Sequence, residues 1–358
     1  MTDPCNIVLI GAGHAHLVAL PALRRSLPDA RITMIDPAPY AAYSGMLPGV
    51  IAGHYDMAQA RFDLALIAVK YNVRLIRARV IGFDPVNRIV QTRQGGLSFD
   101  LASLDVGIQA DMPRIAGFDQ YAVAVKPLAP FAERWTGFAA QPGPVTVIGG
   151  GVAGVEIALA AAHRIGPKVT VVEAGPRVLT ELPIGPRKLL LEALASYNVT
   201  VHLKSRVTSI GVGQVVLADG TRIDSALTIG AAGGRPASWL ARDLPTDEGG
   251  FVTIGADLQV SGHQGIFATG DCAIMQHAPR PRAGVYAVRQ GPDLARNLVA
   301  AAKGQTLSRH NPQKHHLKII SLGGKVGLAT WRGVHVSGPW VWRWKDRIDQ
   351  RFMSRNST

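Results

Sequence analysis

The chain has 358 residues, 47% of them hydrophobic, which is enough for about two domains with real cores and excludes a disordered protein. Its net charge is +13, and no stretch of roughly 18 uninterrupted apolar residues occurs, so we expect no membrane-spanning helix. Two cysteines cannot form a disulfide framework, and the N-terminus lacks the long apolar region of an export signal, so we expect a cytoplasmic protein.

The start of the chain has the pattern of a β-α-β unit, with a buried strand, a helix and a second strand predicted within residues 6–35. Gly11 and Gly13 lie in the turn after the first strand, where glycines let the backbone approach a pyrophosphate. Asp36 ends the second strand, where an acid binds ribose hydroxyls. His16 stands where a third glycine is usual, so a degenerate fold that binds nothing is the alternative.

The same pattern returns over residues 145–173, and here it is complete. Gly149, Gly151 and Gly154 follow a predicted strand and open a predicted helix, and Glu173 ends the next strand. A helix N-terminus at this place presents partial positive charge to phosphates. The acid repels a 2′-phosphate, which favours NAD(H) over NADP(H). Because both copies continue into a ribbon-like stretch and a closing strand, the chain is predicted to hold two nucleotides in two similar units.

A third motif, Ala268-Thr-Gly270-Asp271, follows a short predicted strand and precedes a predicted helix over residues 283–302. It resembles the second FAD fingerprint of the pyridine nucleotide–disulfide oxidoreductase superfamily, in which the matching aspartate binds the ribityl chain. The order of the three motifs agrees with that family. The resemblance implies an α/β fold of two nested Rossmann-like domains, similar to glutathione reductase, with FAD as cofactor and NAD(H) as substrate.

The resemblance also implies the domain limits and the cofactor contacts. An FAD domain is expected at residues 1–110 and 241–310, with an NAD(H) domain at 111–240 inserted into it and a short basic α+β extension at 311–358. The residues expected to bind FAD are Gly11, Gly13, His16, Asp36, Ser44, Gly270 and Asp271. Those expected to bind NAD are Gly149, Gly151, Gly154 and Glu173.

Disulfide chemistry is not expected, because thiol–disulfide exchange needs an attacking thiolate and a partner. The stretch 40–46, where active disulfide reductases carry a cysteine pair, has none, and Cys272 is expected to be a small packing residue. The chain is more similar to type II NADH dehydrogenases. Its segments 11–16, 43–49, 51–55 and 287–291 also resemble the flavoprotein that is fused to, or encoded beside, selenophosphate synthetase.

These resemblances imply hydride transfer from NADH to FAD and on to an acceptor, a quinone first and a selenium or sulfur species second. Glu156 and Gln290 are the candidate catalytic residues, because they match a glutamate near the nicotinamide–flavin contact and a glutamine of the quinone-site helix. A helix surface carboxylate is the alternative for Glu156. Residues 284–286 depart from the quinone-site pattern, and His14, His16 and His54 match no metal-ligand spacing, so we expect no metal.

The last part of the chain concentrates positive charge, since residues 303–358 hold 11 Lys and Arg against two Asp, a net +9. Residues 303–316 are predicted to be a linker, residues 317–336 short strands, and residues 340–353 a helix that mixes tryptophan with arginine. Such a helix suits a peripheral contact of residues 340–355 with the inner face of a membrane. Packing on the FAD domain with the tryptophans in the core is the alternative, and a flavin-bearing sensor with a basic tail is another. No specific nucleic acid is expected, and a homodimer stays open.

Overall fold

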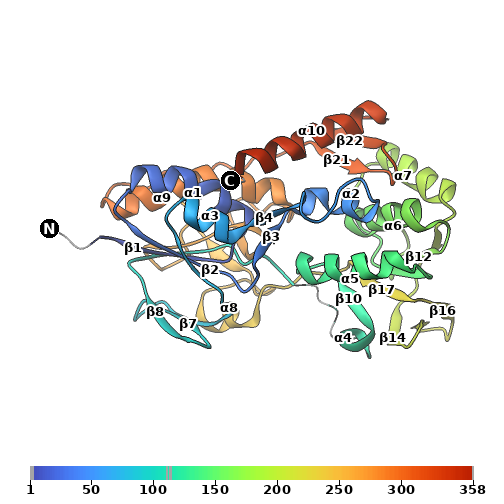
Figure 1. Ribbon diagram of the computed structural model, residues 1–358, viewed down its shortest axis with the longest axis horizontal. Helices are drawn as coiled ribbons and strands as arrows, with labels where there is room; N and C mark the ends of the chain where they lie inside the picture. Colours follow the sequence, from blue (N-terminus) through green and yellow to red (C-terminus); the bar gives the residue numbers. More distant parts are fainter. Residues whose placement is uncertain (1–3, 110–111, 113–114, 357–358) are drawn as a thin grey trace.

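A computed structural model of the chain describes residues 4–109, 112 and 115–356. Two α/β domains, each with a parallel five-stranded sheet, lie side by side, and a long helix near the C-terminus runs across both of them (Figure 1). The predicted fold class of two nested Rossmann-like domains is confirmed. The second domain is inserted in the first, because one strand of the first sheet comes from beyond the second domain.

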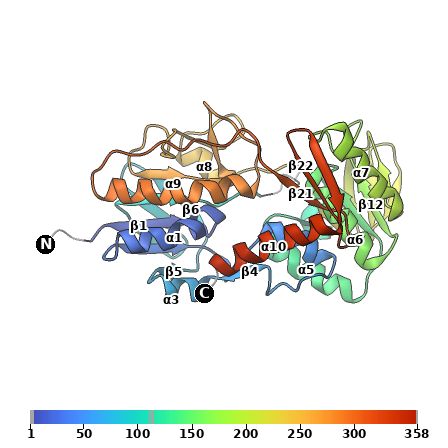
Figure 2. The same cartoon turned by 90° about the horizontal axis from the view of Figure 1, so that it is seen from above.

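The first sheet has the order β19-β9-β1-β2-β5, with all neighbours parallel. Its strands are β1 (Asn6–Ile10), β2 (Arg31–Ile35), β5 (Arg74–Ile76), β9 (Leu101–Leu104) and β19 (Ile266–Ala268). All but the edge strand β5 are almost continuously apolar and buried, as expected for a sheet covered on both faces. Helices α1 (His14–Ser26) and α9 (Gly284–Ala302) pack against each other beside it (Figure 2).

Smaller elements complete the first domain. They are β3 (Tyr40–Ala42), η1 (Ser44–Met46), α2 (Leu47–Ile51), β4 (Arg61–Asp63), α3 (Leu64–Lys70), β6 (Val80–Asp84), β7 (Ile89–Thr92), β8 (Gly95–Ser98), α8 (Ser238–Asp243), β18 (Val252–Ile254), η2 (Gly270–Cys272) and β20 (Ala273–Met275). Strands β6, β7 and β8 form an antiparallel ribbon just before β9.

The second domain repeats this plan, as the sequence predicts. Its sheet has the order β10-β17-β11-β12-β13, and a ribbon of β14, β15 and β16 again precedes the strand that closes the sheet. Its elements are α4 (Phe118–Tyr121), β10 (Ala122–Ala124), α5 (Leu128–Ala140), β11 (Val145–Ile148), α6 (Val152–Ile165), β12 (Val169–Val172), α7 (Ile184–Ser196), β13 (Thr200–His202), β14 (Val207–Gly211), β15 (Gln214–Leu217), β16 (Arg222–Asp224) and β17 (Leu227–Gly230).

The C-terminal extension joins the two domains. An antiparallel sheet of β21 (Lys318–Ser321), β22 (Gly327–Trp331) and β23 (Val334–Gly338) leads into α10 (Pro339–Asn356). Strand β21 packs on α6 of the second domain. At the other end of α10, Phe352 stacks on Tyr43 of the first domain, with ring centroids 4.7 Å apart.

Helix α10 packs on the first domain, but the expectation that its tryptophans lie in the core is wrong for two of them. The exposed fraction is 49% for Trp340 and 38% for Trp344, and the buried residues of the helix are instead Val341, Asp349 and Met353. The reason is the helical period, since residues four apart share one face and this face points outward. None of the helices in the described ranges combines the length and apolarity that crossing a membrane requires.

Candidate functional site

A cavity of about 610 Å³ lies where the two domains meet. The first domain lines it with the turn after β1, the ends of β2 and β9, and the start of α9, while the second domain contributes residues 126–128, Ala153 and Glu156. The carboxyl ends of parallel strands are where α/β folds bind nucleotides. The volume falls within the range of about 300–1,000 Å³ that is usual for cofactor sites.

The turn after β1 accepts only glycine at two places. Gly11 has a φ of +88°, and a Cβ there would lie 2.4 Å from the carbonyl oxygen of Asp105. A Cβ on Gly13 would lie 2.1 Å from the Asp105 carboxyl carbon. Gly13 is also the N-cap of α1 and has no side chain to cap it; the Asp105 carboxylate instead accepts from the N–H groups of Ala15 and His16 in the first turn. The partial positive charge that remains at the helix start would attract a pyrophosphate.

His16, predicted as a cofactor contact, is fully buried and lies outside the cavity lining. Its Nδ1 is 2.6 Å from the carbonyl oxygen of Gly11, and its Nε2 is 2.8 Å from the hydroxyl of Ser103 on β9. Burial lowers the pKa of His16 to about 4, so the ring is neutral at neutral pH. Nδ1 then donates to the carbonyl and Nε2 accepts from the hydroxyl. The imidazole thus holds the glycine turn to strand β9 of the sheet by two hydrogen bonds.

Asp36 and Ser44 both line the cavity. The Asp36 carboxylate accepts hydrogen bonds from the backbone N–H groups of Ala12 and Ala38, each 2.8 Å long. These bonds fix the carboxylate beside the glycine turn, at the height where a ribose would lie if the pyrophosphate occupied the start of α1. The position fits the expected role of Asp36 toward the adenosine half of FAD.

Asp105 is a site residue that the sequence motifs did not identify. It follows β9, is buried, and accepts hydrogen bonds from the N–H groups of Ala15 (2.8 Å) and His16 (3.3 Å) in the first turn of α1. Burial raises its pKa to about 7, although these two bonds act in the opposite direction. The signal that could have identified it is its place at the carboxyl end of a central strand.

The Gly270–Asp271 turn reaches the cavity from the other side. Gly270 has a φ of +67°, and Asp271 lines the cavity, with its Oδ2 2.6 Å from the Nζ of Lys126. The N–H of Gly270 donates to the amide oxygen of Gln290 over 2.8 Å. Gln290, expected as a catalytic residue, is thus placed to hold this turn.

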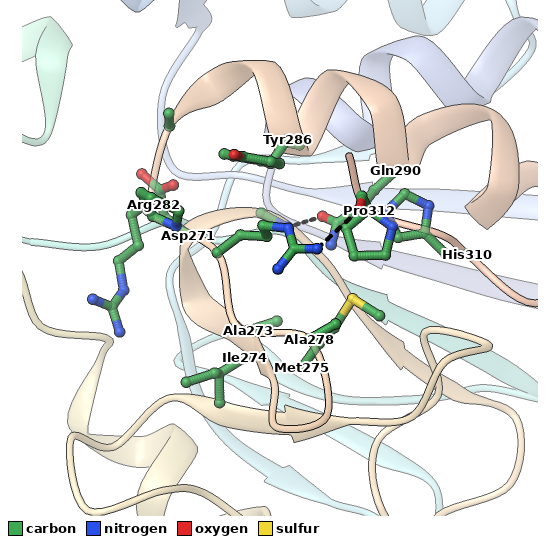
Figure 3. A pocket seen from close by; sticks show the side chains of 15 residues that line it. Asp271, Ala273, Ile274, Met275, Ala278, Arg282, Tyr286, Gln290, His310 and Pro312 are labelled. Carbon is green, nitrogen blue, oxygen red and sulfur yellow. Dashed lines mark hydrogen bonds between the residues drawn. The ribbon is translucent and has the colours of Figure 1, made fainter. Parts of the chain in front are cut away.

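A smaller pocket lies on the far side of the same turn and is lined by Asp271, Tyr286, Gln290 and His310. Figure 3 shows Tyr286 and Gln290 reaching it from α9, with Asp271 at one end and His310 at the other. Two of its polar side chains have partners outside the lining, since His310 pairs with Asp293 over 2.5 Å and the Tyr286 hydroxyl lies 3.0 Å from Nδ1 of His316.

The turn after β11 has the geometry of a complete fingerprint. Gly149 has a φ of +116°, and a Cβ on Gly154 would lie 2.0 Å from the Gly149 carbonyl oxygen, so helix and strand are in close contact. Gly151 is the N-cap of α6. The Glu173 carboxylate accepts from the N–H groups of Gly150 (2.7 Å) and Gly175 (2.6 Å), which repeats the arrangement of Asp36.

Glu156 extends from α6 to the cavity and is not a solvated surface carboxylate. The N–H of Ser321 on β21 donates to its Oε1 over 2.6 Å. Burial raises the pKa of Glu156 to about 7, and the charge of Lys345 on α10 acts in the opposite direction. The sequence motif identified Glu156. Ser321, which bonds to it, and Lys345, whose charge lowers its pKa, both belong to the C-terminal extension.

Lys345 belongs to a buried group around the same point. Its Nζ is 2.6 Å from a carboxylate oxygen of Asp349, whose other oxygen accepts from the hydroxyl of Tyr43 over 3.1 Å. Tyr43 lies edge-on to His14, which lines the cavity. Helix α10 is therefore linked to the site through Tyr43 and through the charge of Lys345 near Glu156.

Neither cysteine supports disulfide exchange. Cys272 is buried, its Sγ donates to the Thr269 carbonyl oxygen over 3.3 Å, and burial raises its pKa to about 12. Cys5 is also free, so the expected absence of a redox-active pair is confirmed. In the part of the chain that the structure describes, no group of His, Cys, Asp and Glu side chains has the arrangement of a metal site.

The chain belongs to the pyridine nucleotide-disulphide oxidoreductase family, whose sequence model matches residues 5–299. It is an oxidoreductase, and family membership implies a flavin and a pyridine nucleotide. The chain is 23% identical to the type II NADH:quinone oxidoreductase of Staphylococcus aureus (strain NCTC 8325 / PS 47), over 98% of this chain and 95% of the relative.

Two solved structures have the same fold. The sulfide:quinone oxidoreductase of Aquifex aeolicus is superimposed with a TM-score of 0.80 at 18% identity and covers 98% of this chain and 91% of its own. The NDH2 structure from Plasmodium falciparum, in complex with NADH, has a TM-score of 0.78 at 13% identity and covers 98% of both chains.

Proposed function

We propose that this chain transfers a hydride from NADH to FAD in the cavity between the domains, and that the electrons pass on to a quinone. The observation that carries the proposal is that one cavity is bordered both by the glycine turn and Asp271 of the first domain and by Ala153 and Glu156 beside the second glycine turn. Bound FAD supplies the hydride-accepting and electron-donating chemistry, and the protein supplies position and charge.

The chain's own residues have separate tasks in this proposal. The start of α1 and Asp36 hold the adenosine diphosphate half of FAD, and Asp271 and Ser44 hold the ribityl and ring half. Glu173 and the start of α6 bind NADH and bring its nicotinamide toward the cavity. Because Glu173 carries negative charge where a 2′-phosphate would lie, NADH is favoured over NADPH.

Glu156 is the proposed proton carrier. Reduction of a quinone takes up two electrons and two protons, and a carboxyl group with a pKa of about 7 is populated in both forms at neutral pH. Its bond from Ser321 fixes one oxygen, and Lys345 provides a positive charge when the proton leaves. Gln290 acts as a positioning residue through the Gly270 N–H.

The test is anaerobic addition of NADH to the purified, FAD-loaded protein. We expect the flavin absorbance to bleach and to return on addition of a quinone. Absence of bleaching would refute the proposal and would favour a flavin-bearing sensor. Bleaching that is reversed by sulfur or selenium compounds, and not by quinones, would leave hydride transfer in place and contradict the quinone.

The pH dependence of quinone reduction tests Glu156 itself. We expect an inflection near pH 7 in the wild type and its loss in Glu156→Gln, with bleaching by NADH largely retained. Glu133→Gln is the matched control, because it makes the same change at an exposed residue of α5, leaves Glu156 unchanged and should keep the inflection. An unchanged inflection in Glu156→Gln would contradict the assignment.

We further propose that α10 contacts an anionic membrane surface. Trp340, Trp344 and Ile348 are exposed at every fourth position, and Arg347 and Arg351 share this face. Tryptophan favours the lipid interface, and a segment of net charge +9 is attracted to anionic headgroups.

Flotation with vesicles measures this contact. The wild type should float with vesicles of phosphatidylcholine and phosphatidylglycerol, less so with phosphatidylcholine alone or in high salt. The Trp340→Ser/Trp344→Ser double variant should stay at the bottom, while Trp135→Phe, a change in the core, should float as the wild type does. Equal flotation of the wild type and the double variant would contradict the proposal.

A further inference from the structure

Lys126 joins the two domains inside the cavity. It follows β10 of the second domain, yet its Nζ lies 2.6 Å from the Asp271 carboxylate of the first domain. Its side chain is 38% exposed and lines the cavity, whereas the Asp271 side chain is 16% exposed. A cation of the second domain therefore pairs with the aspartate of the FAD fingerprint in the first domain.

The charges around the cavity are unbalanced before any ligand is bound. Among the described lining residues, the carboxylates are Asp36, Asp105, Glu156 and Asp271, and the cations are Arg79 and Lys126. Arg79 acts electrostatically on Asp36, and Lys126 acts on His14 and pairs with Asp271. Arg79 is therefore the cation near Asp36 in the cavity, and Lys126 is the cation near Asp271.

A flavin adds further negative charge to this site. FAD has two negative charges on its pyrophosphate, and accepting a hydride adds two electrons and one proton, a net charge of minus one on the ring. The ring that receives the hydride must lie where the nicotinamide can reach it, which is toward the second domain. The second domain lines the cavity with Lys126, Pro127, Leu128, Ala153 and Glu156, and Lys126 is the cation among them.

We propose that Lys126 is the cationic ligand of the flavin ring in this site. Its ammonium group, held by Asp271, lies against the junction of ribityl chain and ring and stabilises the negative charge gained on reduction. The N-terminus of α9, which also borders the cavity, adds partial positive charge but no mobile cation. This inference rests on the proposed binding of FAD in the cavity.

The midpoint potential of the bound flavin, measured by equilibration with redox dyes, tests the proposal. Lys126→Met should lower the potential, because reduced FAD loses its partner and oxidised FAD does not. A tenfold loss in preference for the reduced form corresponds to about 30 mV for a two-electron couple. Lys126→Arg should restore most of the shift. Lys168→Met, which removes an exposed lysine before β12, should have the wild-type potential.

The alternative position of the ammonium is at the pyrophosphate, and it gives a different result. Lys126→Met would then bind oxidised and reduced FAD more weakly by the same factor, and the potential would not change. That outcome would overturn the inference. If Lys126→Met holds FAD too weakly for dye equilibration, anaerobic titrations give its dissociation constants for both forms, and their ratio reports the same quantity.

Failure of this inference is separable from failure of the proposed function. A wild-type protein that binds no FAD, or whose flavin NADH does not bleach, contradicts the proposed function. A wild-type protein that passes both tests, with an unchanged potential in Lys126→Met, contradicts only the assignment of Lys126.

Discussion

Two buried titratable residues, Asp105 and His16, contact the turn after β1 and the start of α1, and their pKa values shift in opposite directions. Burial raises the pKa of Asp105 from 3.8 to about 7 and lowers that of His16 from 6.5 to about 4. Both therefore favour the neutral form in the folded protein. The folded state keeps the Asp105 proton while the unfolded state releases it, so Asp105 costs stability as pH rises from about 4 to 7. His16 costs stability as pH falls from 6.5 to about 4.

Asp105→Asn isolates the first of these effects. The variant cannot ionise, so its free energy of unfolding relative to the wild type should increase from pH 4 to pH 7 and be constant above that. Any fixed cost of the lost acceptor oxygen shifts the curve without changing its slope. Urea unfolding of the flavin-free protein at each pH measures the difference, in which the contribution of His16 cancels. Two parallel stability curves would show that Asp105 ionises in the fold as it does in water.

Glu173 determines the coenzyme in our proposal, and a second acid on the same loop is its control. Glu173→Ala should raise KM for NADH by about 10- to 100-fold, because a hydrogen bond to a charged group contributes about 1.5–3 kcal/mol. It should affect NADPH much less, since the repulsion of the 2′-phosphate is also lost. The ratio of kcat/KM for the two coenzymes, measured by flavin bleaching, should fall by a similar factor.

Glu181 accepts a hydrogen bond from the N–H of Val152 at the start of α6, over 2.7 Å, where the pyrophosphate of NADH is expected. Glu181→Ala frees this N–H and should lower KM for NADH and NADPH by the same factor. A Glu173→Ala enzyme that discriminates as the wild type does would mean that another residue sets the preference.

At the scale of elements, local patterns predict the strands and helices that follow one another along the chain. The two β-α-β units, the ribbons, and the late strands and helix follow from apolar periodicity and glycine turns. Local patterns do not predict contacts between segments that are distant in the sequence. Asp105 reaches α1 through the register of β9 against β1, and Lys345 approaches Glu156 only because α10 crosses both domains. The sequence predicts Glu156 but carries no signal for its partners.

Helix α10 contains a buried ion pair between Lys345 and Asp349, and both partners also bond the first domain, Lys345 at the Gly45 carbonyl oxygen and Asp349 at the Tyr43 hydroxyl. The side chains of Lys345 and Asp349 are 15% and 5% exposed, so removing one charge leaves the other buried and unpaired. Asp349→Ala should therefore cost about 3–5 kcal/mol of unfolding free energy. Asp346→Ala is the control on the same helix, because it removes only the 2.6 Å hydrogen bond from the half-buried Tyr55, a loss of about 0.5–1.5 kcal/mol. Urea unfolding of the FAD-loaded protein measures both. Similar losses would indicate that the pair is hydrated and that other contacts hold α10.

The whole molecule is one architecture used twice, with the two copies meeting at a shared cavity. Asp36 and Glu173 are equivalent in the two copies, since each carboxylate accepts from two backbone N–H groups beside its own glycine turn. The cavity is shared, but the two carboxylates proposed to bind the adenosine halves, Asp36 and Glu173, lie in separate domains. Binding of one nucleotide should therefore survive damage to the acid of the other domain.

Thermal shifts of the flavin-free protein test this independence. A ligand at a hundred times its Kd stabilises the fold by about 2.7 kcal/mol, so FAD and NAD+ should each raise Tm measurably. Asp36→Ala should abolish most of the FAD shift and keep that of NAD+, and Glu173→Ala should do the reverse. The double variant, which keeps both glycine turns, should lose both shifts. If Asp36→Ala removed the NAD+ shift as well, the second domain would depend on the first for its binding site, and the duplicated plan would not extend to binding.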